Sequence, residues 1–549
     1  MFRLNNSNIE QMSLFSKESM WSPYQRKLID NCWVGYFHDH IFPSINEEPY
    51  SVLYSSDNAS CPNTPVNFLV GVLIIKSITG QSDEEIINSV YFDERVQYAL
   101  HTINLTKQPI SKNMLNLFRN RIRDYEKKTG INLLENTMRE LNKIILNLHK
   151  IDRSIERMDS MMISSSCKKM SRIELVYTIN YNFIKLLEKK NKTPEEFKCY
   201  LDSKNKNDVI YRTKVNEEDS KLLTLLQNSL SLYDTFKDDE EVNKSEEFKL
   251  LKRIIDEQYD NEKKGPKDGK EIKPDSLQNP SDPNATYRFK YGNNHGYAAN
   301  MVEAVNDGKP MIVDWEVDTN ITSDAKFIEN YINKKIENND TTEITEVVDG
   351  AYFSEELDKK AKEANIKLHP TELIGRKPKE SNLSEFVIDE ETHLVLECPN
   401  GNIPLETNYD EEKQVIKAKF EKKSCENCPN REKCPLNFNQ KKVNIFKVEL
   451  SKLTNSKLRN EQKTEQYQKI SNMRAGIEGL PSLFRRKYNI DNRGSKGLLR
   501  LKIEFSTGVI AINIKRACKI APISNNMSII FLKFIKKLKL EYFFLDFSF

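Results

Sequence analysis

The sequence predicts a mixed α/β (α+β) protein in which helices precede, interrupt and follow a β-rich core. Three observations lead to this fold class. Apolar residues recur at helical spacing through the first 150 residues. Strand-like runs occupy 157–163, 296–302, 310–317 and 342–349, and a long helical stretch separates the first run from the others. At 549 residues, the chain is long enough for roughly three or four folding units.

Local signals place the N-terminal helices. Ser82 and Glu85 have the spacing of a capping box, which predicts that a helix begins there. A second helix is expected from Ser111, after Pro109. A third follows Gly130 and carries an apolar stripe at helical spacing: Leu134, Met138, Leu141, Ile145 and Leu148. Such stripes are most often the buried face of a structural bundle.

The later chain divides by composition. A segment rich in Gly, Pro, Lys and Asp reads as a linker or mobile loop. Helices are expected to begin at Ser323 or Asp324 and at Ser354. The expected units are an N-terminal helical domain (1–150), the first part of a catalytic domain (151–375) with a helical insert (168–258) and a mobile linker (259–284), a Cys-rich insert (376–445), a basic C-terminal part (446–520) and an apolar, lysine-containing tail (521–549).

The charge distribution favours a polyanionic partner. Hydrophobic residues make up 38% of the chain and charged residues 30%, which is polar but not typical of wholesale disorder. The formal charge is only +3. Between Pro481 and Ile520, however, ten Lys or Arg residues stand against two acids, a net charge of about +8.

No membrane or secretory segment is expected. The start, MFRLNNSNIEQ, has no apolar core after its basic residue, and the apolar run Phe68–Ile75 is far shorter than the roughly 20 residues that span a bilayer. Nine cysteines without a secretory signal indicate a reducing, cytoplasmic compartment, where clustered cysteines more often bind metal than form disulfides.

Two aspartates stand where apolar strands end. Asp159 lies inside IERMDSMMISSS, and Asp349 precedes Gly350 at the end of another strand. A buried acid needs a hydrogen-bonding partner or a cation. Two acids on adjacent strands could share Mg²⁺, which prefers few carboxylates, water and phosphate oxygens. Ordinary turn chemistry at Asp-Gly is the alternative for Asp349.

A third candidate lies in ISNMRAGIEGLPSLFRRKY. Arg474 and Glu478 are four residues apart, so they would share one face of a helix, and Arg485 to Lys487 continue into the basic segment. An ordinary surface ion pair is the alternative.

Several sequence blocks resemble successive parts of bacterial insertion-sequence transposases of the DDE class, in the order of that family. They are MDSMMISSS, DPNATYRFKYGNNHGYAANMVEAV, TSDAKFIENYI, VVDGAYFS and MRAGIEGLPSLFRRKYNIDNRGSKGLLRLKIEFSTGVIAINIKR. The helical front half, with PVNFLVGVLIIKSITGQSDEEI and PISKNMLNLFRNRI, resembles the N-terminal domain of the same group.

The resemblance implies a ribonuclease H-like catalytic domain with Asp159, Asp349 and Glu478 as catalytic metal ligands for Mg²⁺ (or Mn²⁺). It also implies hydrolysis at the element's end followed by attack of the freed 3′-hydroxyl on target DNA. In the related signature Tyr-x-x-Arg-x-x-x-Glu-x-x-x-x-x-x-Lys, Arg474 and Glu478 match, whereas Ser471 replaces the Tyr and Arg485 the Lys.

The resemblance also implies partners. These are double-stranded DNA, as transposon terminal inverted repeats and target, and a second copy of the chain in a homodimer or higher assembly. The DNA-binding candidates are Arg474, Arg485, Arg486, Lys487, Arg493 and Lys496.

Four cysteines are grouped late in the chain. Cys398, Cys425, Cys428 and Cys434 have a spacing compatible with a structural Zn²⁺ site, although the gap from Cys428 to Cys434 is wider than in a regular zinc ribbon. Unligated thiols and an iron–sulfur cluster are the alternatives. The resembled family carries a similar Cys-containing insert.

Two other functions are compatible with the same residues. A non-catalytic DNA-binding protein derived from a transposase would keep the basic segment and lose the acids. A metal-dependent nuclease would cut DNA without joining it. All three candidate acids are present, which favours a transposase over the first alternative.

Overall fold

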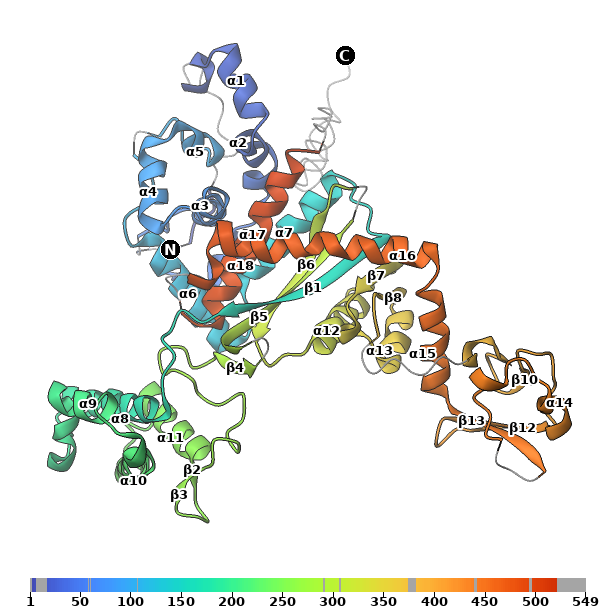
Figure 1. Cartoon of the computed structure of the whole chain (residues 1–549). Helices are drawn as coiled ribbons and strands as arrows, with labels where there is room; N and C mark the ends of the chain where they lie inside the picture. The colour runs from blue at the N-terminus through green and yellow to red at the C-terminus, as the bar shows by residue number, and fades with distance from the viewer. Residues whose placement is uncertain are drawn as a thin grey trace, which may run out of the picture.

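The computed structural model describes residues 2–5, 17–57, 59, 61–105, 107–289, 292–305, 308–373, 382–438, 442–492 and 496–520. At its centre is a six-stranded mixed sheet in the order β4-β5-β1-β7-β8, in which β6 also pairs with β5 (Figure 1). The strands are β1 (Ile155–Ser164), β4 (Thr286–Phe289), β5 (Asn293–Ala304), β6 (Met311–Thr319), β7 (Ile344–Val348) and β8 (Ile366–Pro370). The mixed α/β class is therefore confirmed.

Strand β1 joins the antiparallel and parallel parts of this sheet. It pairs antiparallel with β5 from Glu156↔Ala304 to Ser164↔Gly296. On its other edge it pairs parallel with β7, where Glu156 lies opposite Glu346. Strand β7 in turn pairs parallel with β8. The first strand of the chain thus lies at the middle of the sheet.

Helices cover both faces of the sheet (Figure 1). Successive side chains of β1 point to opposite faces. Met158 packs in a core with α12 (Asp324–Glu337) and α13 (Glu355–Glu363). Met161 packs on the other face, in a larger core formed with the N-terminal helices and α18 (Leu498–Ala517).

The N-terminal elements between Lys17 and Leu148 are helical throughout the described residues. They are η1 (Lys17–Met20), α1 (Pro23–Asp30), α2 (Trp33–Tyr36), the π-helix η2 (Phe37–Ile41), η3 (Phe42–Ser44), η4 (Glu48–Leu53), α3 (Val66–Thr79), α4 (Asp83–Phe92), α5 (Glu94–Ala99), α6 (Met114–Thr129) and α7 (Leu133–Leu148). The predicted capping box is present, because Ser82 and Glu85 each bond the other's backbone amide. Helix α6 begins at Met114 rather than Ser111.

The insert after β1 is helical and has its own core. Its elements are α8 (Arg172–Lys189), η5 (Glu195–Leu201), α9 (Ser203–Ile210), η6 (Val215–Glu217), α10 (Glu218–Phe236), α11 (Glu246–Gln258), β2 (Tyr259–Asp260) and β3 (Gly265–Pro266). Phe183, Leu226 and Leu251 are fully buried in this core. Leu277, from the segment expected to be a linker, is buried there too.

The remaining elements are η8, which directly follows β7, a small Cys-containing unit that runs from η9 to β13, and the C-terminal helices. They are η8 (Gly350–Tyr352), η9 (Leu383–Glu385), β9 (Val387–Ile388), β10 (Val395–Glu397), β11 (Glu406–Asp410), β12 (Val415–Glu421), α14 (Lys422–Glu426), η10 (Arg431–Lys433), β13 (Val443–Glu449), α15 (Leu450–Glu461), α16 (Glu465–Asn472), η11 (Met473–Glu478), α17 (Gly479–Tyr488) and η12 (Ile490–Asn492). Helices α15 and α16 lead from the Cys-containing unit back to the central sheet (Figure 1). The tail 521–549 and Arg493 lie outside the described residues.

Candidate active site

Asp159 lies on β1, and Asp349 directly follows β7, the strand that is parallel to β1. The pairing of β1 with β7 runs to Arg157↔Val347. The same register continued by two residues brings Asp159 beside Asp349, on the same face of the sheet. The side chain of Asp159 is 21% exposed and that of Asp349 is 53% exposed. The two sequence-predicted aspartates therefore lie side by side at the point where β7 ends.

Arg474 brings the third acid to this place. Its Nη2 lies 3.4 Å from Oδ1 of Asp159 and 4.0 Å from Oδ2 of Asp349. Its Nη1 lies 3.8 Å from Oε1 of Glu478. The three carboxylates, which are far apart in the sequence, thus surround one guanidinium.

Arg474 and Glu478 are carried by a tight 3₁₀ helix rather than by a regular α-helix. This helix, η11, lies between α16 and α17 and begins at Met473. It packs on β1 and β7, and its Ile477 is fully buried in the large core. The sequence predicted that the two side chains share a helix face, and their contact is present, although the helix is wound more tightly than expected. A stretch of 3₁₀ helix between two α-helices often marks a functional hinge or a strained sequence.

The electrostatic surroundings of Asp159 are mixed. Burial raises the pKa of the Asp159 carboxyl above its ordinary value, and the neighbouring charges of Asp324 and Asp349 raise it further. The Arg474 guanidinium opposes this shift. The positive charge of Arg474 therefore offsets part of the cost of placing the Asp159 carboxylate among other acids.

A fourth acid lies behind Asp159. Asp324, the first residue of α12, is buried and accepts a hydrogen bond from Oγ of Ser160 at 2.6 Å. The sequence predicted only that a helix begins at Ser323 or Asp324, and the N-cap of α12 is Ser323. Tyr352 is buried nearby and donates to Oδ1 of Asn300 at 2.9 Å. These groups form a polar layer beneath the candidate acids.

The basic candidates lie at the end of α17 and beyond. Nη2 of Arg485 donates to the carbonyl of Met162 on β1 at 3.0 Å, and its Nε donates to Oδ2 of Asp491 at 3.2 Å. Arg486, Lys487 and Lys496 are exposed. Arg485 is thus fixed three residues beyond Asp159 along β1, whereas the other described basic side chains extend into solvent.

Ser471, which stands where the resembled signature has Tyr, takes part in a local contact instead. Its hydroxyl lies 3.0 Å from Nε2 of His369, whose ring stacks on Tyr467 at 3.7 Å. The Tyr467 hydroxyl donates to the carbonyl of Pro370 at 2.8 Å. Tyr467 is therefore committed to the junction of β8 with α16 and does not take over the missing Tyr position.

The donor set around Arg474 has the right chemistry for a divalent cation, but not the arrangement of a filled metal site. Carboxylate oxygens are the ligand type that Mg²⁺ uses. Within the described part of the chain, no group of three or more His, Cys, Asp and Glu side chains is placed so that it could hold a metal ion. The acids here surround a guanidinium instead.

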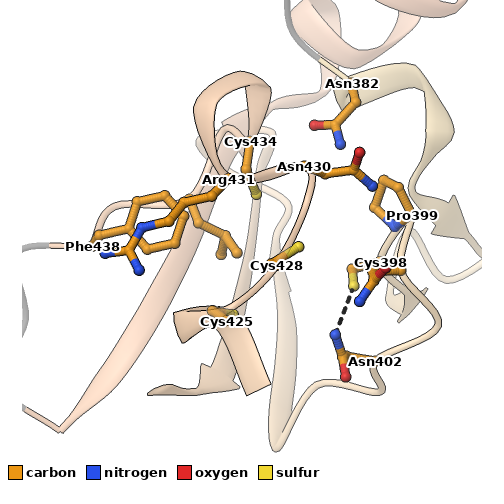
Figure 2. A pocket seen from close by; sticks show the side chains of 12 residues that line it. Asn382, Cys398, Pro399, Asn402, Cys425, Cys428, Asn430, Arg431, Cys434 and Phe438 are labelled. Carbon is orange, nitrogen blue, oxygen red and sulfur yellow. Dashed lines mark hydrogen bonds between the residues drawn. The ribbon is translucent and has the colours of Figure 1, made fainter. Parts of the chain in front are cut away.

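The four late cysteines line a single pocket in the Cys-containing unit (Figure 2). Cys425 is buried, and the Sγ of Cys398 accepts a hydrogen bond from Nδ2 of Asn402 at 3.5 Å. Burial raises the pKa of the Cys434 thiol to about 11, and the other three cysteines add to this shift. The described cysteines do not form a metal-holding group, so the geometry lends no support to the predicted zinc ion.

The comparisons with known proteins bear on the C-terminal part of the chain. The family described as "Transposase DDE domain" has a model that matches residues 397–518. This range includes Arg474, Glu478 and the four cysteines. No curated protein and no solved structure matches the chain.

The match supports a DDE-class transposase, the class that the sequence resemblance predicts. Asp159 and Asp349 lie outside the matched range. Their assignment depends on the resemblance and on their contact with Arg474.

Sequence reasoning missed a buried ion pair beside the site. Arg157 and Glu303 are buried and ion-paired next to the acids. A signal was available for Arg157, since an arginine inside an apolar strand two residues before Asp159 demands a partner. Nothing local to Glu303 identifies that partner, because 146 residues separate the two.

Proposed function

We propose that the protein is a DNA transposase that cleaves DNA at transposon ends and joins the freed 3′ end to target DNA. One observation carries this proposal, namely that Asp159, Asp349 and Glu478 all face Arg474. The family match to a transposase DDE domain supports it independently. These three acids are far apart in the sequence, so it is the tertiary fold that brings them around the Arg474 guanidinium.

A ribonuclease H-like catalytic domain is part of the proposal. The order β6-β5-β1-β7-β8, antiparallel up to β1 and parallel after it, supports this topology. So do the positions of the acids, with one on the central first strand, one after a later parallel strand and one on a helical turn packed against both.

The chain's own residues have distinct roles in this proposal. Asp159, Asp349 and Glu478 would hold Mg²⁺ or Mn²⁺. When bound, such ions activate the attacking hydroxyl and stabilise the leaving oxygen of a phosphodiester. Arg474 neutralises the acids and carries further donors for a phosphate oxygen. Burial raises the pKa of Asp159, and the Arg474 guanidinium opposes this shift.

The DNA partner would contact the basic side chains around the acids. We propose Arg474, Arg485, Arg486, Lys487, Arg493 and Lys496 for this role. Arg485 is anchored beside β1, and the exposed Arg486 and Lys487 extend the positive charge from it. Affinity that depends on such phosphate contacts should fall steeply as salt is added.

The wider organisation is also a proposal. The N-terminal helices (1–150) would bind the transposon ends, and two or more copies would assemble on DNA, in the cytoplasm. The unit boundaries at 151, 376, 446 and 521 remain predictions. None of the helices in the described part of the chain combines the length and apolar character needed to span a bilayer.

The decisive experiment replaces one acid. Asp349→Asn should abolish cleavage of duplex DNA taken from the flanks of the gene. Its affinity for that DNA should change little, because the negative charge of Asp349 is needed to bind the metal ion and not to bind DNA phosphates. Glu356→Gln, an exposed acid on α13 seven residues further along, is the control and should cleave normally. Undiminished cleavage by Asp349→Asn would remove Asp349 from the site.

A second assay separates transposase from nuclease. Given a pre-cut end with a free 3′-hydroxyl, a transposase joins that end to a target duplex. An enzyme that hydrolyses duplexes but never produces joined products would be the metal-dependent nuclease. Binding without either reaction, in the presence of Mg²⁺ or Mn²⁺, would identify a non-catalytic descendant.

We also propose that the Cys-containing unit holds one structural Zn²⁺ ion. The support is chemical, since four thiols line one pocket and a zinc ion would offset the cost of ionising buried thiols such as Cys434. The purified protein should contain zinc in about a one-to-one ratio, measured by elemental analysis. Cys434→Ser should lose it, whereas Cys199→Ser, exposed in the helical insert, should keep it. Absence of zinc would favour free thiols, and bound iron with sulfide would favour a cluster.

A further inference from the structure

A buried ion network fastens the turn that carries Arg474 and Glu478. Arg157 lies on β1 two residues before Asp159 and is 8% exposed. Its Nε donates to Oε2 of Glu303 at 2.7 Å. Its Nη1 donates to the carbonyl oxygen of Met473, the first residue of η11, at 2.6 Å. One guanidinium thus joins the central strands to the start of the turn.

The partner of Arg157 is itself fixed on both sides. Glu303 is fully buried and lies opposite Arg157 in the pairing of β5 with β1. Its other oxygen, Oε1, accepts from Nη1 of Arg516 in the last turn of α18 at 2.6 Å. A buried carboxylate bonded by two guanidinium groups holds them in defined positions, because any departure leaves a charge unpaired in a poorly solvating interior.

Gly476 shows how closely this guanidinium approaches the turn. A Cβ atom added at Gly476 would lie 2.1 Å from Nη1 of Arg157 and 2.7 Å from its Nη2. The side chain of Arg157 therefore packs directly on the backbone midway between Arg474 and Glu478. Gly479, three residues later, has no atom within 4 Å of the corresponding Cβ position. The need for glycine is specific to position 476.

We propose that Arg157 is a positioning residue for the candidate active site. By bonding the Met473 carbonyl and packing against Gly476, it sets the height and rotation of η11 over β1 and β7, so that Arg474 and Glu478 face the two aspartates. Arg157 itself bonds Glu303 and the Met473 carbonyl rather than those carboxylates. This inference rests on the proposed function, because the groups that it positions are the candidate catalytic ones.

The test compares Gly476→Ala with Gly479→Ala in the full chain. Gly476→Ala forces the Arg157 guanidinium off the turn without removing any charged group. Amide hydrogen exchange of peptides that cover 473–478 should become faster, while exchange in β1 and α18 stays unchanged. The kcat for DNA cleavage should fall about 10- to 100-fold, as expected for a small misplacement of a reacting group, with little change in KM. Gly479→Ala should match the unaltered protein in both measurements.

Arg157→Lys provides a second variant. Lysine keeps a positive charge for Glu303, but its single ammonium cannot reproduce the planar fork that bonds Glu303 and Met473 together. It should give the same local rise in exchange and the same loss of kcat as Gly476→Ala. The double variant should lose no more than either single one, because both act on one contact.

Three results would overturn the proposal. They are unchanged exchange at 473–478 in both variants, an equal loss in Gly479→Ala, and faster exchange throughout the protein with a lowered melting temperature, which would mean a general structural role. If the unaltered protein does not cleave DNA, the proposed function fails on its own. The hydrogen-exchange comparison still decides whether Arg157 positions the turn.

Discussion

Two buried glutamates meet side by side in the middle of the sheet. Glu346 on β7 lies opposite Glu156 on β1, and both are fully buried. Glu156 accepts a hydrogen bond from Nε of Arg153 at 2.6 Å and another from the Tyr331 hydroxyl. In the described structure, neither carboxylate oxygen of Glu346 has a hydrogen-bond partner. A hydrogen bond between Glu346 and Glu156 therefore requires a proton on one of the two carboxyl groups.

This arrangement predicts a stability that falls as pH rises. Burial, reinforced by the charge of Glu156, raises the pKa of Glu346 well above the ordinary value of 4.5. Above that ordinary value the unfolded chain gives up the proton while the folded protein keeps it, so rising pH favours unfolding until the folded state ionises too. Asp314 adds further negative charge to the surroundings and acts in the same direction.

Glu346→Gln should remove this dependence, because the amide can donate to Glu156 without a titratable proton. Above the ordinary pKa, the variant should exceed the unaltered protein in unfolding free energy by up to about 1.4 kcal/mol for each pH unit over which only the folded protein keeps the proton. The difference should shrink towards about pH 4, where the glutamate is protonated in both states. Urea unfolding across this range measures it.

The control for this experiment is Glu343→Gln, since Glu343 is an exposed acid just before β7. It should leave the pH dependence as it is. If the unfolding free energy of Glu346→Gln changes with pH as steeply as that of the unaltered protein, the shared-proton arrangement is contradicted.

At the scale of single elements, the sequence predicts the ends of helices and strands correctly where a strong local signal is present. The capping box of Ser82 and Glu85 is present as predicted. The helix expected to begin at Ser323 or Asp324 has Ser323 as its N-cap, and the strand expected to end at Asp349 ends at Val348. Helix α6 was placed three residues early. The side chain of its N-cap residue, Asn113, makes no capping hydrogen bond, so the sequence there contains no comparable signal.

The 3₁₀ character of η11 could not be predicted from its own residues. MRAGIE has no feature that excludes a regular α-helix apart from its glycine. The contact that holds it comes from Arg157, which is 316 residues away from Met473 in the sequence. Local patterns singled out Asp159, Asp349 and Glu478 as candidates, and the family resemblance assigned all three to one catalytic site. Their convergence on Arg474 depends on strand pairing and helix packing that no local pattern specifies.

At the scale of the whole molecule, the N-terminal helices and the sheet share one core. The large hydrophobic core includes Phe68 of α3, Leu141 of α7, Met301 of β5 and Val509 of α18. The helical insert instead buries its apolar residues in a separate core. The N-terminal helices should therefore unfold together with the sheet, whereas the insert has the means to unfold by itself.

A buried polar contact joins the three parts of the large core. Strand β6 bulges opposite β5, where Glu303 pairs with Ile312 and Val302 with Asp314. A bulge leaves backbone groups without ladder partners. At this bulge the amide of Ile312 donates to Oδ1 of Asn513 on α18 at 3.0 Å. Nδ2 of Asn513 in turn donates to Oδ1 of Asn142 on α7 at 2.7 Å.

Asn513→Ala should therefore destabilise the N-terminal helices and the sheet in a single step. It leaves the buried amide of Ile312 without an acceptor, so the unfolding free energy should fall by about 1–3 kcal/mol. Tryptophan fluorescence follows both parts at once, because Trp21 and Trp33 lie in the N-terminal part and Trp315 lies in β6. Asn116→Ala, at an exposed position on α6, should change little. Two separate transitions in the tryptophan fluorescence would mean that the N-terminal helices fold independently of the sheet, despite the core that they share.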